Sequence, residues 1–299
     1  PRSTLFPYTT LFRSLDYQFV IDGNNWINDA GNPARCAGGY GENSELRMPG
    51  SAIPPETLSH PEIPGGSLID SLWYSKTMQN QRKIIIYLPA EYQQTIHRYP
   101  VIFFHDGNDY LTFANAHKIL DYLIHNQIIE PVIGVFIPAL ERTQEFIGHK
   151  KDPYSAFLVT ELIPGIDSAF RTMREPGSRA MAGVSNGGNI TLYTAFRFPG
   201  TFGNIAIHSS NILPEQFRTI RKSPVLNLTI YADIGRYDMP ELIPLTYKLK
   251  EIVLKKGYHT EVRQWNEGHS WGNWEEHLRY PLQLFFATEK SKIKTDKNK

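Results

Sequence analysis

The sequence predicts an α/β fold in which helices cover both faces of a mainly parallel sheet. Short apolar runs bounded by Pro or Gly recur after residue 66, as buried strands do. Segments with helical spacing of apolar residues lie between many of these runs. This alternation is typical of parallel strands joined by crossover helices. With 41% apolar and 12% aromatic residues, the chain has ample material for a buried core.

The expected elements follow one another along the chain without an internal repeat. The expected strands are 83–88, 101–104, 132–137, 179–182, 204–208, 226–232 and 259–265. The expected helices are 116–126, 157–170, 189–198, 242–256 and 274–288, and Pro164 with Gly165 should bend the second of them.

Residues 15–50 differ from the rest in composition and pattern, and they predict a short β-rich unit. Residues 17–21 predict a strand, and Asp22-Gly23-Asn24-Asn25 is a strong turn signal. Residues 26–41 are rich in Asn, Gly and Pro and suit loops, whereas 44–48 predict a last short strand. A stretch of this length is too short to bury a core by itself.

The other segments are expected to flank a folded domain at residues 67–288. Residues 51–66, with four prolines, predict a linker, and the lysine-rich residues 289–299 predict a disordered basic tail. Residues 4–14 match the translation of a widely used sequencing adapter. We therefore expect residues 1–14 to be foreign to the natural protein and its N-terminus to lie upstream. Cytoplasmic and exported locations are then both open.

Composition excludes several classes of function. The formal net charge is +1 without a basic stripe, which argues against a nucleic-acid partner. No apolar run approaches the roughly 20 residues that span a bilayer. The single cysteine, Cys36, excludes an internal disulfide framework and a multi-cysteine metal site. Oligomeric state stays open.

The decisive local feature is Gly183-Val184-Ser185-Asn186-Gly187, which follows an expected strand and precedes an expected helix. A Gly-x-Ser-x-Gly in that context predicts the nucleophile elbow of an α/β-hydrolase, with an ordinary Gly-rich turn as the alternative. The chain must turn within a few residues, which strains the serine backbone, and the small neighbours let chain segments pass closely. The sequence therefore predicts Ser185 as a nucleophile.

A serine hydroxyl needs a base, and in this fold the partners follow in the order serine, acid, histidine. Of ten histidines, His269 follows a strand on a Gly-bearing loop just before the last helix, so it is predicted as the general base. His277 lies within that helix and is expected at the surface. His208 precedes any candidate acid.

The acid is expected on the loop after 226–232, where Asp233 and Asp238 both occur. Asp233 stands at the strand end, where Asp commonly caps a turn. Asp238 lies further along the loop, within reach of a histidine loop, and is preferred, with Asp233 as the alternative. The acid would fix the imidazole tautomer and stabilise the imidazolium.

An oxyanion formed in acyl transfer also needs hydrogen-bond donors. One is expected from the backbone N–H of Asn186, directly after the nucleophile. The other should come from the loop after strand 101–104, so the N–H of Gly107 or Asn108 is the candidate, with a plain β-turn as the alternative.

At these residues the chain resembles the esterase family that includes enterochelin esterases and feruloyl esterases. The resemblance spans about 82–286 and implies a cofactor-independent Ser-His-Asp hydrolase. The motifs that carry it are Tyr87-Leu88-Pro89, Phe104-His105-Asp106-Gly107, Glu161-Leu162-Ile163-Pro164, Ala182 to Gly188, Pro199 with Phe202-Gly203, Gly235-x-x-Asp238 and Gly268-His269-x-Trp271-x-x-Trp274.

The same resemblance implies that an immunoglobulin-like early-set domain precedes the catalytic one. Residues 15–50 resemble the C-terminal half of such a domain, so they are interpreted as its truncated remnant. The matching residues are Tyr17, Phe19, Ile21, Asp22, Gly23, Trp26, Asp29, Asn32 and Pro33.

Four further side chains are candidates for substrate binding. Arg142 stands where enterochelin-type members have an "R…EL" segment and would hold a carboxylate, catecholate or phenolate, with a surface ion pair as the alternative. Trp271, Trp274 and Phe104 would line an aromatic acyl pocket, with core packing as the alternative.

The predicted function is serine-dependent hydrolysis of a carboxylic ester, small or glycan-linked, through an acyl-enzyme and without a metal or organic cofactor. Two alternatives stand beside it. An acyltransferase of the mycolyl-transfer type uses the same triad, and a non-catalytic glycan-binding member would keep only the fold. The sequence does not choose among siderophore, feruloyl or acetyl polysaccharide, and short-chain esters.

Overall fold

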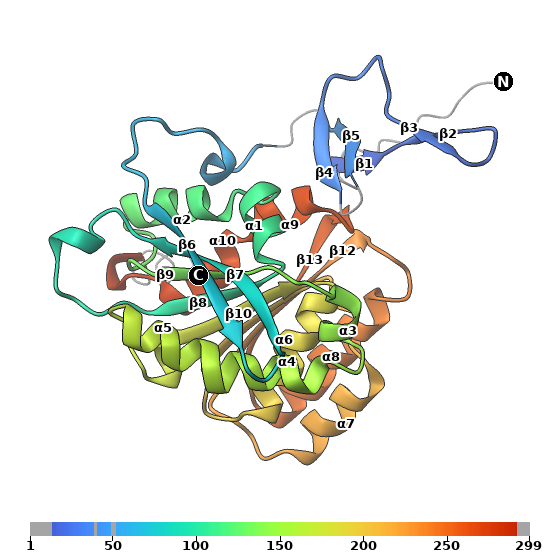
Figure 1. The fold of residues 1–299 in the computed structure, drawn as a ribbon. Helices are drawn as coiled ribbons and strands as arrows, with labels where there is room; N and C mark the ends of the chain where they lie inside the picture. Colours follow the sequence, from blue (N-terminus) through green and yellow to red (C-terminus); the bar gives the residue numbers. More distant parts are fainter. Residues whose placement is uncertain (1–13, 39–40, 49–51, 292–299) are drawn as a thin grey trace.

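The computed structural model describes residues 14–38, 41–48 and 52–291. The segment expected to be foreign lies outside this range except for Ser14, and so does most of the expected tail. The described chain forms an eight-stranded sheet in the order β13-β12-β11-β10-β8-β9-β7-β6, with helices on both faces (Figure 1). Among the eight strands, only β7 runs against the others. The predicted mainly parallel sheet, covered on both faces, is confirmed.

The sheet strands are β6 (Ser67–Ser75), β7 (Asn80–Leu88), β8 (Val101–His105), β9 (Ile133–Ile137), β10 (Arg179–Val184), β11 (Asn204–His208), β12 (Thr229–Tyr237) and β13 (His259–Gly268). The α-helices are α1 (Gly107–Thr112), α2 (Ala116–His125), α3 (Arg142–Phe146), α4 (Lys151–Phe157), α5 (Ile163–Ala169), α6 (Asn186–Arg197), α7 (Pro214–Lys222), α8 (Ile243–Lys256), α9 (Trp271–His277) and α10 (Arg279–Phe286). Shorter helical turns are η1 (Pro55–Thr57), η2 (Tyr92–Gln94), η3 (Leu158–Leu162) and η4 (Pro176–Ser178).

Two hydrophobic cores sandwich the sheet. Helices α3 to α8 cover one face, and α1, α2, α9 and α10 cover the other (Figure 1). Strand β8 shows how one segment serves both, because Val101 and Phe103 pack into the first core while Ile102 and Phe104 pack into the second. A strand buried on both faces reads as an unbroken apolar run, which is why β8 could be predicted.

The chain changes direction across the sheet at β8. From β8 it passes to β9 on one side, and it later returns to β10 on the other side. In open α/β sheets, ligands bind outside the carboxyl ends of the strands at such a switch point. The fold therefore places its binding crevice where β8 and β10 end.

Several predicted elements are wrong in detail. The loop expected at 26–41 contains β3 (Asn25–Ile27) and β4 (Arg35–Gly38), and the expected helix 157–170 is α4 and α5 joined by the π-helical turn η3. Pro164, which has no N–H to donate, stands at the start of α5, so a proline adjoins this irregular turn. The edge strand β6 is absent from the prediction because its apolar side chains are largely exposed.

Residues 14–38 and 41–48, called here the N-terminal β segment, form a three-stranded sheet and a hairpin. The sheet order is β1-β5-β4, where β1 is Ser14–Tyr17 and β5 is Gly41–Arg47, and β2 (Phe19–Ile21) pairs with β3. The segment lies against α9 and the end of β13 (Figure 1). Arg47 Nη1 lies 3.0 Å from Glu276 Oε1 on α9. In the described part of the chain, no helix has the length and apolar character needed to cross a membrane.

Candidate active site

Ser185 occupies the sharp turn between β10 and α6. Its backbone has φ 54° and ψ −118°, a strained conformation for a residue with a side chain. The turn is held by the Ser185 N–H, which donates to the His208 carbonyl at 2.8 Å. Gly183 is required because a Cβ there would lie 2.2 Å from the Gly187 carbonyl oxygen. Ser185 therefore lies on a sharp, strained turn from strand to helix.

The predicted oxyanion donors lie at the starts of two helices. Asn186 begins α6 after β10, and Gly107 begins α1 after β8. Because β8 and β10 are adjacent and parallel, both helices begin at the same edge of the sheet. The first N–H groups of a helix have no partner within it, and those of Asn186, Gly107 and Asn108 are in this position. Asn108 is exposed, whereas Gly107 is buried.

His269 follows β13 and is paired with Asp238. A hydrogen bond of 2.7 Å joins His269 Nδ1 to Asp238 Oδ1. Asp238 is itself fixed, because it accepts hydrogen bonds from the Met239 N–H at 2.8 Å and from Ser209 Oγ at 2.5 Å. A Cβ on Gly235 would lie 2.2 Å from the Glu267 carbonyl oxygen, so glycine lets the ends of β12 and β13 approach.

Ser185 and His269 line one cavity of about 390 Å³. Trp271 and Trp274 contribute to its wall although both are almost fully buried. The Trp274 ring meets the His269 ring edge to face at 5.0 Å, and its Nε1 donates to Ser209 Oγ at 3.0 Å. Both tryptophans therefore pack in the core and also line the cavity.

Comparison with known proteins identifies the family. A family model described as "Putative esterase" matches residues 75–283. The chain belongs to this esterase family. The predicted resemblance to enterochelin and feruloyl esterases is thereby confirmed, and an esterase function is the assignment that the family supports.

Individual relatives of this esterase are distant. "Uncharacterized protein YjcH" of Bacillus subtilis is 25% identical over 70% of this chain and 93% of its own length. The "Endo-1,4-beta-xylanase/feruloyl esterase" of Xylanibacter ruminicola is 27% identical over 75% of this chain, which spans 32% of that protein. The enterobactin esterase of Shigella flexneri, solved with enterobactin, superposes with a TM-score of 0.75 at 23% identity, over 87% of this chain and 69% of its own. The likeness to this solved structure establishes the α/β-hydrolase fold.

Asp233, the alternative acid, is paired with a different histidine of the esterase. Its Oδ2 is 2.9 Å from His208 Nδ1, and both side chains are fully buried. The Tyr231 hydroxyl donates to the same oxygen at 3.0 Å. Burial by itself would raise the pKa of the Asp233 carboxyl, but the interactions with His208, His277 and the Tyr231 hydroxyl together hold the pKa below its usual value. In the described part of the chain, Asp233 is hydrogen-bonded to His208, Tyr231 and Trp265, whereas His269 is hydrogen-bonded to Asp238.

Arg142 borders the cavity but is already engaged. Its Nε and Nη2 donate to both carboxylate oxygens of Asp106 at 2.8 to 3.0 Å, and Nη2 also donates to the Val184 carbonyl at 3.3 Å. Burial raises the pKa of the Asp106 carboxyl above its usual value, although the guanidinium opposes the rise. The pair ties the loop after β8 to the end of β10, and so fixes the spacing of the two predicted oxyanion donors.

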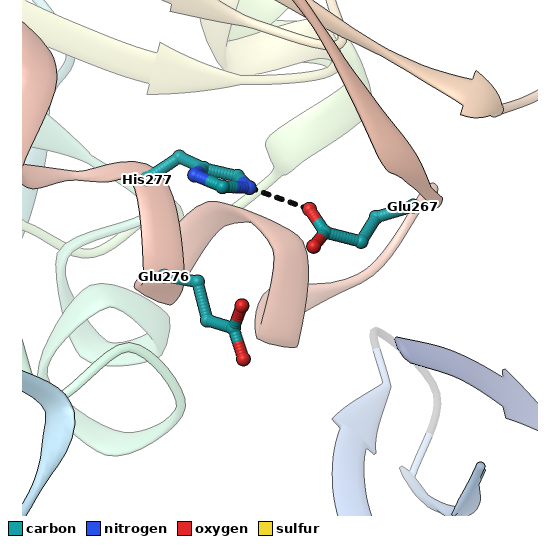
Figure 2. A group of neighbouring side chains, drawn as sticks. All are labelled: Glu267, Glu276 and His277. Carbon is teal, nitrogen blue, oxygen red and sulfur yellow. Dashed lines mark hydrogen bonds and ion pairs between the residues drawn. The ribbon is translucent and has the colours of Figure 1, made fainter. Parts of the chain in front are cut away.

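Outside this cavity, one cluster consists of residue types that can ligate a metal ion. Oxygen or nitrogen atoms of Glu267, Glu276 and His277 lie within 4.8 Å of one another (Figure 2). His277 Nε2 is 2.5 Å from Glu267 Oε2, and Glu276 is paired with Arg47. His277 is buried and stacks on Trp265 at 3.8 Å, so its expected surface position is wrong. The cluster ties the His269 loop and the N-terminal β segment to α9.

Sequence reasoning missed four side chains that line the cavity. Asp16, Gln18 and Asn43 come from the N-terminal β segment, and Asp109 comes from α1. No local pattern marks them, because their position depends on how the segment docks against the domain.

Proposed function

We propose that this esterase is a serine carboxylic-ester hydrolase with Ser185 as nucleophile, His269 as general base and Asp238 as the acid of the triad. The observation that supports it best is that Ser185, on its strained turn, and His269, bonded to Asp238, line the same cavity. Nucleophile, base and orienting acid are the three roles that acyl transfer of this type requires.

The proposed reaction has two steps. His269 Nε2 removes the Ser185 proton as Oγ attacks the ester carbonyl, and the oxyanion accepts hydrogen bonds from the amides of Asn186 and of Gly107 or Asn108. The imidazolium then gives its proton to the leaving alcohol, which leaves an acyl-enzyme. A water molecule, deprotonated by His269, attacks the acyl carbonyl, and return of the proton to Ser185 releases the acid.

The substrate proposal is an ester of an aromatic or short acyl group. The bifunctional relative's name includes feruloyl esterase, and another relative is an enterobactin esterase. Trp271 and Trp274 offer flat apolar surface beside His269, which suits an aromatic acyl group.

The test is an assay with p-nitrophenyl acetate, methyl ferulate and ferric enterobactin on the wild type and on Ser185→Ala. We expect turnover of at least one ester and a loss of about 10⁵-fold or more in kcat in the variant. A fluorophosphonate should label Ser185 in the wild type only. A folded wild type that turns over none of the esters and resists the probe would refute the proposal and favour a binding module. Transfer to a sugar acceptor in preference to water would favour an acyltransferase.

A further inference from the structure

The N-terminal β segment supplies one wall of the cavity that holds Ser185. Asp16 lies on β1, Gln18 directly follows it, and Asn43 lies on β5, which pairs antiparallel with β1. Asn43 Nδ2 donates to Asp16 Oδ2 at 2.7 Å, so the two side chains form one polar surface. Carboxylates and amides hydrogen-bond readily to hydroxyl groups.

This wall is fixed to the element that carries the two tryptophans. Arg47 bridges Glu45 on its own strand and Glu276 on α9, at 2.9 and 3.0 Å. Cys36 packs so closely on α9 that a Cβ on Gly272 would lie 2.9 Å from its Sγ. The position of Asp16 relative to the cavity therefore follows from docking contacts on both β4 and β5.

The charges around the cavity favour one kind of substrate. Asp16 on β1 and Asp109 on α1 both line it, and each carries a carboxyl group. Among the described residues that line the cavity, Arg142 is the one lysine or arginine, and it is bound bidentately by Asp106. A cleft lined mainly by one sign of charge repels ligands of that sign.

We propose that Asp16, Gln18, Asn43 and Asp109 form a subsite for the alcohol half of the ester, which accepts an uncharged polyhydroxylated alcohol such as a sugar and repels an anionic one. This inference rests on the proposed function. The aromatic side chains of Trp271 and Trp274 would serve the acyl half, so the polar wall is left for the alcohol. An anionic alcohol would meet two carboxylates with no uncommitted arginine to offset them.

The test compares the monoacetate esters of glucose and of gluconate, esterified at the same primary hydroxyl, at low ionic strength. We expect the wild type to prefer the glucose ester by about 10-fold in kcat/KM, with the preference shrinking as salt screens the carboxylates. Asp16→Asn should reduce that ratio to about 3-fold or less, and Asp109→Asn, on a different element, should reduce it in the same direction. Because each ratio is taken within one variant, a general loss of activity cancels.

The matched control is Glu42→Gln, which removes an exposed carboxylate from β5 next to Asn43 without touching the cavity. Its ratio should equal that of the wild type. The subsite is refuted if the ratio is unchanged in both Asp variants while p-nitrophenyl acetate is still hydrolysed, or if the wild type prefers the gluconate ester. Absence of Ser185-dependent turnover of p-nitrophenyl acetate would instead overturn the hydrolase assignment, and the subsite with it.

Discussion

The esterase has two Asp–His pairs of the same chemistry at the same end of its sheet. His269 Nδ1 is 2.7 Å from Asp238, and His208 Nδ1 is 2.9 Å from Asp233. Both acids are buried. His208 ends β11 and His269 follows β13, and β12 lies between these two parallel strands. The rings differ, because 23% of the His269 side chain is exposed and none of the His208 side chain is.

The difference teaches that an Asp–His hydrogen bond does not by itself make a base. His269 borders the cavity that Ser185 lines, so its free nitrogen can face a hydroxyl and a substrate. The Nε2 of His208 is buried without a hydrogen-bond partner in the described part of the chain. The backbone of His208 instead holds the Ser185 turn through its carbonyl. We therefore interpret the buried pair as support and the cavity pair as the proposed catalytic one.

The largest effect is expected at the cavity pair. Asp238→Asn should lower kcat about 10⁴-fold, because the amide favours the wrong imidazole tautomer and cannot stabilise the imidazolium. The unfolding free energy should fall by about 1–2 kcal/mol, since most of the hydrogen-bond partners can be kept. Steady-state kinetics on p-nitrophenyl acetate, with urea unfolding of the same samples, provides both numbers. A variant within about 10-fold of the wild type would remove Asp238 from the triad.

The reverse result is expected at the buried pair. Asp233→Asn should cost about 3 kcal/mol of stability, because it breaks a fully buried pair and disturbs the Tyr231 hydrogen bond. Measured well below its melting temperature, kcat should stay within about 3-fold of the wild type. A loss of 100-fold or more in a folded Asp233→Asn protein would reverse the two roles.

Local signals in the sequence predict the sheet core and the Ser185 turn. Strands such as β8 and β10 are buried on both faces and therefore form continuous apolar runs, and the elbow is specified within five residues. Strand β6 was missed because an edge strand exposes its side chains. The early-set interpretation of residues 15–50 stays a prediction.

The candidate site could be proposed where each residue carries its own local signal. His269 and Asp238 are 31 residues apart, but each follows an expected strand on a loop with a Gly motif, so both could be proposed, with Asp233 as the alternative acid. The engagement of Arg142 by Asp106, 36 residues away, and the presence of Asp16 at the cavity depend on tertiary docking. Burial of His277 depends on the direction in which α9 faces, which its position in a helix leaves undetermined.

The buried pair should also leave a signature in the pH dependence of stability. The pKa of Asp233 is lower in the folded protein than its usual value of about 3.9, so the pair stabilises the fold above that pH. This contribution is lost as the pH falls through the folded pKa. The difference in unfolding free energy between the wild type and Asp233→Asn should therefore stay constant from pH 7 to about 5 and shrink below about 4. Urea unfolding at each pH measures it, and a difference that grows with acidity would contradict the shift.

The smallest effects are expected at the two hydroxyl groups that donate hydrogen bonds to Asp238 and Asp233. Ser209 Oγ donates to Asp238 at 2.5 Å, and the Tyr231 hydroxyl donates to Asp233 at 3.0 Å. Removing a hydrogen bond to a charged group costs about 1.5–3 kcal/mol. The loss should lower kcat where the charged group acts in catalysis, and the free energy of unfolding where it only supports the fold. Ser209→Ala should therefore lower kcat about 5- to 10-fold, since Asp238 is less firmly oriented. Tyr231→Phe should lower the free energy of unfolding by about 1.5–3 kcal/mol and leave kcat unchanged. If both variants changed only stability, Ser209 would not be needed to orient Asp238. The Ser209 hydroxyl, which also accepts the Trp274 N–H, would then contribute to packing alone.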